Sequence, residues 1–388
     1  MTPRKKKLVR KKAARKAKPK RKPPDVAEFY KVLAQKSERA RLASEVEGFR
    51  SVPTIFPGFN RATTVGGAPL SCVWLTHGPS AGGKTFFLCG LIRSFQLVGG
   101  LCVFIDAELA ADTQRWFRFL GLDLDRVIYI GRTADGSKKR PMVYEEIVDE
   151  VERILDLYQS LKADGRIPKD APLIVVVDSV SKMIPANLLK KIQGKEGGKA
   201  LSGGVGRVQA LLNTAWLAAL GPRVGDDNIL FAVIAHEMED EKSGSWQKGW
   251  KVRGGGALVY DSMMQVRVSF AGQTKDLSAD GAPATGKCHR VKILKNKHGP
   301  AFEEAYLYSS TGRGICPMGF DRVREVLHEG ITRGLVDGPA SPREMTVGSS
   351  VTFGGKSYTL KKLYVPENAG AIEELAERLD ADLLEESK

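Results

Sequence analysis

The stretch from residue 78 to residue 85 constrains the fold of this chain most, because it matches the pattern G-x-x-x-x-G-K-[ST] of a P-loop. Its residues are Gly78, Pro79, Ser80, Ala81, Gly82, Gly83, Lys84 and Thr85, and Phe86 follows. Glycines let successive backbone N–H groups converge on phosphate oxygens at the positive end of a helix. Lys84 is then expected to reach the β and γ phosphates of ATP, and Thr85 to ligate Mg²⁺. A simple glycine turn is the alternative interpretation.

The segments around this loop fit a P-loop. Residues 72–75 form an apolar, strand-like run, and residues 85–97 place apolar side chains at helical spacing before Gly99 and Gly100 end the pattern. Apolar runs then alternate with helical patterns as far as residue 235, and three strand-like runs follow at 266–270, 290–294 and 304–309. We therefore predict an α/β fold with an open, mostly parallel sheet and an antiparallel extension.

Acidic residues follow two of the apolar runs. Residues 101–105 lead into Asp106 and Glu108, and residues 173–177 lead into Asp178 in the manner of a Walker B strand. The carboxyl ends of parallel strands meet at one edge of a sheet, so these acids are expected beside the P-loop. Asp178 would hold Mg²⁺ through water. An apolar run that ends in an acid is also common in parallel sheets without such a role.

Two segments rich in Gly, Lys and Ser leave the same predicted edge, at residues 190–206 and 237–256. We expect both to be irregular loops that bind DNA, since lysines neutralise phosphates and tryptophans stack on the bases of single strands. The candidate DNA-binding residues are Lys190, Lys191, Lys195, Lys199, Lys242, Trp246, Lys248, Trp250, Lys251 and Arg253. Alternatively, the tryptophans cover a neighbouring subunit.

The net charge of +15 comes almost entirely from one end of the chain. Residues 4–22 contain 13 Lys or Arg and no acid, which leaves +2 for everything else, and residues 367–388 are acidic. With several prolines and few apolar residues, residues 1–24 are predicted to be a disordered basic arm. This arm is expected either to bind phosphates or to serve solubility or targeting.

Six motifs of this chain, taken in order, resemble those of the RecA recombinases. They lie at residues 78–85, 104–108, 120–125, 175–180, 254–258 and 290–297. The resemblance covers about residues 50 to 320 and implies a RecA-like P-loop ATPase core. It also implies that ATP binds between adjacent protomers of a helical filament on single-stranded DNA, which exchanges that strand into a homologous duplex.

The resemblance assigns roles to particular residues. Glu108 matches the carboxylate that polarises the attacking water, and Asp178 matches the Walker B acid. His236 stands where the bacterial proteins have a Gln that senses the γ-phosphate, and residues 234–236 look more like the phage UvsX recombinases. A histidine can also donate to a phosphoryl oxygen, although an ordinary strand-end histidine is the alternative.

Further positions match the family with some departures. Lys295 and Lys297 match a pair that reaches the neighbouring protomer's nucleotide, although a solvated Lys-x-Lys at a strand end is the alternative. Where the family places a Tyr over the adenine, this chain has Arg115 and Trp116 with a one-residue insertion, so either could stack on the base. Val259 replaces a lysine of the bacterial proteins, which removes one intersubunit contact.

The sequence divides into four predicted parts. They are the basic arm at residues 1–24, a helical oligomerisation segment at 25–50, the ATPase core at 51–320 and a small C-terminal α/β domain with an acidic helix at 321–388.

No apolar run approaches the length needed to span a bilayer. The five cysteines are scattered, and a zinc site built on Cys288, His289, His298 and Cys316 lacks ligand-pair spacing. We therefore expect the protein to lie in the reducing cytoplasm of a bacterial or phage-infected cell, in association with the nucleoid.

Taken together, the sequence predicts a DNA-dependent ATPase of the recombinase class, with ATP and Mg²⁺ as cofactors. Its expected partners are single-stranded DNA, duplex DNA and other copies of itself in a filament. Two alternatives remain open. One is a RecA-fold motor that drives branch migration or unwinding without exchanging strands, and the other is an ATP-gated, filament-forming DNA-binding scaffold.

The basic arm generates the first testable prediction. Deleting residues 1–24 should weaken DNA binding at low salt and leave basal ATP hydrolysis close to wild type, since the P-loop lies elsewhere. Counterion release lowers the logarithm of affinity by about 0.7 per neutralised phosphate on single strands, and by about 0.9 on duplex, for each unit of log salt. The slope of affinity against salt should therefore flatten by several units. Coincident slopes for the intact and shortened proteins would give the arm a solubility or targeting role.

Overall fold

A computed structural model describes most of the chain between residues 26 and 386. The described residues are 26–36, 48, 50–109, 113–131, 142–193, 205–225, 227–240, 249–275, 284–339, 345 and 348–386. The chain separates into two compact units, Met1–Gly48 and Phe49–Lys388. The predicted basic arm therefore lies outside the described residues.

In the first unit the described helix is α1 (Val26–Lys36), which is shorter than the helical segment expected over residues 25–50. Residues 37–47 lie outside the description. Four apolar side chains of α1 are exposed, namely those of Phe29, Tyr30, Val32 and Leu33. They give the helix an unburied apolar surface, in keeping with the prediction that it needs something to pack against.

The second unit alternates strands with helices, as predicted. Its central strands are β3 (Cys72–Gly78), β4 (Leu101–Asp106), β5 (Ile128–Ile130), β6 (Leu173–Asp178), β7 (Ile229–Asp240) and β9 (Met264–Lys275). The helices around them are α2 (Pro57–Thr63), α3 (Lys84–Leu97), α4 (Thr113–Phe119), α5 (Tyr144–Ala163), α6 (Ala186–Gln193), α7 (Val205–Gly225) and α8 (Gly256–Asp261). The remaining strands of the main sheet are β8 (Gly249–Val252), β10 (Ala284–Asn296), β11 (Glu304–Ser310) and β12 (Gly319–Phe320).

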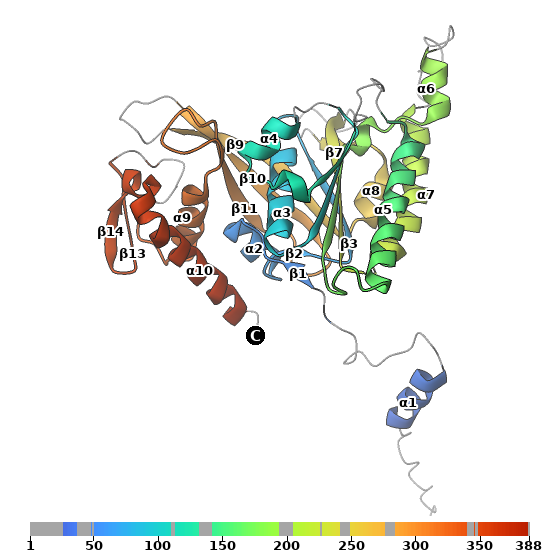
Figure 1. Cartoon of the computed structure of the whole chain (residues 1–388), viewed down its shortest axis with the longest axis horizontal. Helices are drawn as coiled ribbons and strands as arrows, with labels where there is room; N and C mark the ends of the chain where they lie inside the picture. The colour runs from blue at the N-terminus through green and yellow to red at the C-terminus, as the bar shows by residue number, and fades with distance from the viewer. Residues whose placement is uncertain are drawn as a thin grey trace, which may run out of the picture. The chain divides into compact units, whose positions relative to one another are not determined.

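In the described residues, ten strands form one large sheet in the order β12-β11-β10-β9-β3-β7-β6-β4-β5, with β8 paired to β7 (Figure 1). The strands from β9 to β5 in this order are parallel to one another. Strands β10, β11 and β12 continue the sheet in antiparallel pairing. The predicted α/β class, the mostly parallel sheet and its antiparallel extension are therefore confirmed.

Both faces of the parallel strands are covered by helices, which explains their continuous apolar runs. Successive side chains of a strand point to opposite faces. Trp74 and Phe104 thus pack in a core with side chains of α2, α3 and α4. Leu75 and Ile105, each the next residue along its strand, pack in a second core with α5, α7 and α8.

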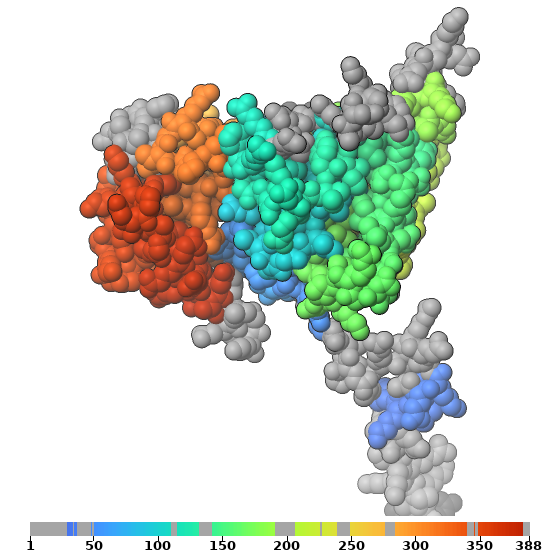
Figure 2. Space-filling view, viewed as in Figure 1, coloured from blue at the N-terminus to red at the C-terminus, as the bar shows by residue number. Residues whose placement is uncertain are grey.

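The C-terminal part of the second unit has an apolar core of its own. It contains α9 (Arg322–Thr332), β13 (Ser350–Phe353), β14 (Lys356–Thr359) and α10 (Ala369–Glu386). Buried side chains such as Val326, Leu360 and Leu375 make up this core. In Figure 2 this part is drawn in red, beside a region of the chain drawn in orange. The domain boundary at residue 321 stays a prediction.

The two predicted loops are more regular at their ends than expected. Residues 190–193 belong to α6, whose apolar residues Leu188, Leu189 and Ile192 fall on one side of a short helix. Strand β7 continues to Asp240, although the second loop was expected to begin at residue 237, and residues 237–240 pair with β8. Pairing of β7 with β8 satisfies backbone groups that an irregular loop would leave to water. The second segment is therefore a β-hairpin at its base, and residues 241–248 lie outside the description.

Other features bear on the compartment and on membranes. Cys72, Cys89, Cys102 and Cys288 are buried and Cys316 is partly buried, and all five thiols are free. None of the helices in the described part of the chain is both long enough and apolar enough to cross a bilayer.

Packing between α2 and α3 generates a stability prediction. Gly90 of α3 faces the ring of Phe56, and a Cβ atom at Gly90 would lie 2.1 Å from Phe56 Cζ. Gly90→Ala should therefore lower the free energy of unfolding by about 1 to 3 kcal/mol, because forced overpacking outweighs the gain of about 1 kcal/mol in helix propensity. Gly370→Ala, where a Cβ meets nothing within 4 Å, is the matched control and should be neutral or slightly stabilising. Urea denaturation measures both, and a Gly90→Ala protein as stable as wild type would contradict the packing.

Candidate active site

The P-loop joins β3 to α3 and depends on glycine at two of its positions. Gly78 has a φ of 149°, and a Cβ there would lie 2.0 Å from the carbonyl oxygen of Val268 in β9. Gly83 has a φ of 101°, and a Cβ there would lie 2.5 Å from Nδ1 of His289 in β10. Any larger residue would be strained at either position. The P-loop therefore packs directly against β9 and β10.

Lys84 is the first residue of α3 and is buried. Its Nζ donates to the carbonyl oxygens of Gly78, at 3.1 Å, and Pro79, at 2.8 Å. Burial lowers the pKa of Lys84, and the negative charges of Asp178 and Glu108 partly offset that effect. The ammonium group thus lies inside the curve of the loop, where phosphate oxygens could replace the two carbonyl acceptors.

Thr85 and Asp178 meet at the amino end of α3. The hydroxyl of Thr85 donates to Oδ2 of Asp178 at 2.7 Å. The pKa of Asp178 is raised from its usual value of 3.8 to about 6, mainly by burial. The hydrogen bond from Thr85 and the charge of Lys84 oppose this rise, and the nearby charges of Glu108 and Asp106 contribute to it. Hydroxyl and carboxylate oxygens are ligands that Mg²⁺ accepts. A crowded carboxylate with a raised pKa is also one that a cation would favour in its ionised form, so these residues fit a magnesium ion.

Glu108 lies just beyond the end of β4 and is held by Ser179, which follows β6, and by His236 of β7. Its Oε1 accepts hydrogen bonds from the hydroxyl of Ser179, at 2.8 Å, and from Nε2 of His236, at 2.5 Å. A carboxylate only accepts, so Nε2 of His236 carries the proton in this contact. Burial raises the pKa of Glu108, but the hydrogen bonds from His236 and Ser179 outweigh it and hold the pKa below its ordinary value. Glu108 is therefore ionised and fixed in orientation.

Asp106 supports Glu108 from behind. Its Oδ1 accepts from the backbone N–H groups of Glu108, at 3.1 Å, and Leu109, at 2.8 Å, and its Oδ2 accepts from the hydroxyl of Tyr129 at 2.9 Å. The backbone N–H of Glu108 is also 3.2 Å from the carbonyl oxygen of Asp178. These contacts set the turn that presents the Glu108 side chain.

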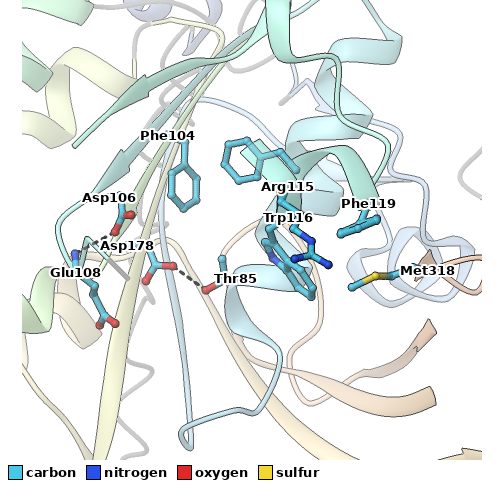
Figure 3. Close-up of a pocket in the computed structure, with 10 residues that line it drawn as sticks. Thr85, Phe104, Asp106, Glu108, Arg115, Trp116, Phe119, Asp178 and Met318 are labelled. Carbon is cyan, nitrogen blue, oxygen red and sulfur yellow. Dashed lines mark hydrogen bonds between the residues drawn. The ribbon is translucent and has the colours of Figure 1, made fainter. Parts of the chain in front are cut away.

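A cavity of about 440 Å³ opens beside these acids. Figure 3 shows the carboxylates of Asp106, Glu108 and Asp178 at the strand ends, with Trp116 and Met318 across the cavity. Arg115 also lines the cavity, and its guanidinium carbon lies 5.6 Å from the centre of the Phe119 ring. The two candidates for stacking on adenine, Arg115 and Trp116, thus both reach this cavity.

A second cavity of about 400 Å³ lies along the P-loop. It is lined by loop residues 80–85, by Phe86, Glu108, Trp116, Leu120, Asp178, His236, Met318 and Gly319, and by Lys287, His289, Ser309, Ser310 and Thr311. Nδ1 of His289 lies 2.8 Å from the carbonyl oxygen of Gly82, which accepts only, so Nδ1 carries the hydrogen. The His289 ring centre lies 5.4 Å from that of Phe86. His289 therefore braces the loop from the side of β10.

Lys295 and Lys297 lie away from both cavities. Strand β10 runs in the opposite direction to β3, and Lys295 lies opposite Gln265 of β9, which in turn lies opposite Leu75 in the middle of β3. The Nζ of Lys295 donates to the carbonyl oxygens of Val259, at 3.2 Å, and Tyr260, at 2.7 Å, at the end of α8. The described walls of the two cavities include neither lysine.

The candidate DNA-binding residues are only partly described. Lys190 is exposed on α6, and Lys191 belongs to the same helix. Trp250, which is 49% exposed, lies with Lys251 on β8, and Arg253 follows that strand. Lys195, Lys199, Lys242, Trp246 and Lys248 lie outside the described residues. The described candidates therefore lie on α6 and at the base of the β7–β8 hairpin.

Several residues of the site were not predicted from the sequence. Ser179 directly follows the Walker B acid, which was the available signal for its contact with Glu108. The sequence marks Asp106 only as an acid at a strand end, and no sequence pattern points to Tyr129. His289 and Met318 come from distant parts of the chain, and only the sheet order brings them to the loop. The described residues contain no group of three or more His, Cys, Asp or Glu placed to bind a metal.

The fold and the site define the class of this protein. A P-loop between β3 and α3, a Walker B acid at the end of β6 and a carboxylate beyond β4 at the same sheet edge make it a P-loop nucleoside triphosphatase. A family model described as the RecA N-terminal domain matches residues 36–316. The chain therefore belongs to the RecA family.

Similar proteins agree with this family. The chain is 26% identical over 347 residues to Protein RecA of Teredinibacter turnerae, which covers 88% of this chain and 87% of that protein. It is 26% identical over 334 residues to Protein RecA of Thermus aquaticus, covering 86% and 84%. It is 27% identical over 286 residues to the mitochondrial DNA repair protein recA homolog of Dictyostelium discoideum, covering 74% and 54%.

Family membership confirms the predicted class of activity, so the chain is a DNA-dependent ATPase of the recombinase class that binds ATP. The resemblance of residues 234–236 to phage recombinases and the roles of individual site residues stay predictions.

Asp178 generates a prediction about pH. Because its pKa is raised in the folded chain, the fold favours the protonated form, and this stability is lost as pH rises from about 4 through about 6. Asp178→Asn, which carries no charge, should therefore raise the free energy of unfolding at pH 7.5 by about 1 to 3 kcal/mol and change it much less at pH 4.5. Urea denaturation without nucleotide or Mg²⁺ measures the difference. An equal effect at both pH values would contradict the raised pKa.

Proposed function

We propose that this protein assembles into filaments on single-stranded DNA, hydrolyses ATP where protomers meet, and pairs the bound strand with homologous duplex DNA. The observation that best supports this proposal is the orientation of Glu108. Its carboxylate is ionised, held by Ser179 and His236, and lines the second cavity together with the Thr85–Asp178 pair. A carboxylate in that position is suited to take the proton of a water that attacks a terminal phosphate.

Thr85 and Asp178 would hold Mg²⁺ in this reaction, Thr85 directly and Asp178 through water. When bound, the ion neutralises charge on the phosphates. Lys84 binds and orients the β and γ phosphates from within the loop, and the backbone N–H groups of the P-loop surround them. The aromatic side of the first cavity excludes water from the adenine base, and Trp116 or Arg115 stacks on that base. Trp116 lines both cavities, whereas Arg115 lines only the first of them.

His236 is suited to act as the nucleotide sensor. Its Nε2 hydrogen is engaged by Glu108, and its backbone N–H donates to Ser181 at 2.9 Å. A γ-phosphate oxygen in the cavity would compete for the Nε2 hydrogen and so free one oxygen of Glu108 for the water. The Ala235-His236 pair is also the feature that supports a phage-type recombinase.

The positions of Lys295 and Lys297 support a shared active site. Both lie away from the cavities of their own chain, and Lys295 is tied to the end of α8. In a filament they would complete the site of the next protomer and stabilise charge on the transferred phosphate, as an arginine finger does. The exposed apolar side chains of α1 would bind a neighbouring protomer.

DNA would bind at α6 and at the β7–β8 hairpin. Lys190 and Lys191 belong to α6, and Trp250 and Lys251 belong to β8. Lysines neutralise the phosphates and the exposed indole of Trp250 stacks on bases without reading sequence, as pairing of arbitrary homologous strands requires. A strand-exchange assay separates this proposal from a motor that only translocates.

The shared site generates a prediction about mixed filaments. Glu108→Gln alone and the Lys295→Ala, Lys297→Ala double variant should each lose ATP hydrolysis stimulated by single-stranded DNA, because each removes one half of the site. In an equimolar mixture, about one interface in four combines an intact Glu108 with intact lysines, so about a quarter of wild-type turnover should return. ATPase assays on the separate and mixed proteins measure this. A mixture as inactive as its components would place both halves within one chain.

A further inference from the structure

Glu237, the residue after His236 in β7, points to the opposite face of the sheet from His236, which lines the second cavity. Side chains alternate along a strand, so His236 points to the face of Ile234 and Glu237 to the face of Ala235. Ile234 packs in the apolar core on the side of α3, whereas Ala235 packs in the core on the side of α7 and α8. The Glu237 side chain is only 1% exposed.

Three strands meet at this buried carboxylate. Arg267 of β9 donates to both oxygens, from Nε at 2.7 Å and from a terminal nitrogen at 2.9 Å. His77 of β3 donates from Nδ1 at 2.9 Å. His77 lies opposite Ala235 in β7 on one side and opposite Arg267 in β9 on the other. We call these three residues, His77, Glu237 and Arg267, the triad.

The triad holds a permanent charge in a buried place. Burial raises the pKa of Glu237, but the hydrogen bonds from His77 and Arg267 outweigh it and lower the pKa to about 2. The carboxylate is therefore ionised throughout the working range of pH, and its bidentate pairing with Arg267 has a defined geometry. Buried ion pairs add little net stability over apolar packing, and their best-attested use is to specify an arrangement.

The triad also lies between two functional elements. His77 directly precedes Gly78, the first residue of the P-loop, and Arg267 directly precedes Val268, whose carbonyl oxygen packs against Gly78. Glu237 is itself the first residue of β7 to pair with β8, opposite Val252. One carboxylate thus ties the entrance of the P-loop to the base of the β7–β8 hairpin.

We propose that the triad is a positioning network that makes the P-loop and the β7–β8 hairpin respond together to nucleotide. This inference rests on the proposed function, in which the hairpin binds DNA. Phosphates bound by the P-loop restrict the end of β3 and engage His236. Because Glu237 fastens the next residue of β7 to both β3 and β9, that restriction extends to the paired strands of the hairpin. Without the triad, phosphates could order the P-loop without changing the hydrogen exchange of β7 and β8.

Hydrogen exchange measured on the full-length protein, in the absence of DNA, tests the proposal. Amide exchange in peptides covering residues 234–256 should slow by about tenfold or more when a non-hydrolysable ATP analogue binds the wild-type protein. In Glu237→Gln, which keeps the shape but loses the charge, that slowing should fall to about twofold or less, while the analogue still protects the P-loop. An unchanged slowing in Glu237→Gln would overturn the proposal, and so would its absence from the wild type.

Asp227→Asn is the matched control. Asp227 pairs with Lys162 just before β7 begins, so this variant also removes a carboxylate from a largely buried ion pair beside the same strand. It should reduce stability but leave the nucleotide-dependent slowing of the hairpin intact. If it abolished the slowing as Glu237→Gln does, the effect would reflect loss of stability and the coupling would be rejected.

Hydrolysis gives a second readout that separates the coupling from the proposed function. Glu237→Gln should bind ATP within about threefold of wild type and lose about tenfold or more of the stimulation by single-stranded DNA. His77→Gln, whose amide can still donate to Glu237, should retain stimulation, and His77→Phe should lose it. A wild-type protein that shows the nucleotide-dependent slowing but no stimulation by DNA would contradict the proposed function and leave the coupling supported.

Discussion

Parallel pairing of β3, β7, β6 and β4 is the constraint on which the rest of the structure depends. Because adjacent parallel strands end at the same edge, the P-loop, His236, Asp178 and Glu108 meet there although they come from four separate segments. Gly78 lies opposite His236, and Asp106 lies opposite Asp178. A shift of one residue in either pairing would turn these side chains to the other face of the sheet.

The same alignment concentrates negative charge, and the surrounding contacts decide what each acid can do. Asp178 is crowded by Glu108 and Asp106, and its raised pKa suits a residue that a cation will neutralise. Glu108 differs because His236 and Ser179 hold its charged form. Asp106 uses both oxygens on internal donors. Three nearby carboxylates thus differ in role because their hydrogen-bond partners differ.

The sequence predicted those features that depend on neighbouring residues. The P-loop, the Walker B run and the alternation of strands and helices are local patterns, and the structure contains all of them. Contacts between distant strands could not be predicted, because they depend on sheet order. His289 reaches the P-loop, and Arg267 reaches Glu237, only because β9 and β10 lie beside β3. The regular base of the second predicted loop was missed for the same reason, because its Gly and Lys content concealed the pairing of β7 with β8.

The proposed role of Glu108 in activating water is the claim on which the mechanism depends most. The most direct measurement is ATP binding and single-turnover hydrolysis by Glu108→Gln in the presence of single-stranded DNA. The amide keeps the size of the side chain but cannot take up a proton, so ATP affinity should stay within about threefold of wild type and the hydrolysis rate should fall by at least about a hundredfold. Hydrolysis at the wild-type rate would contradict this role of Glu108 and require a different base.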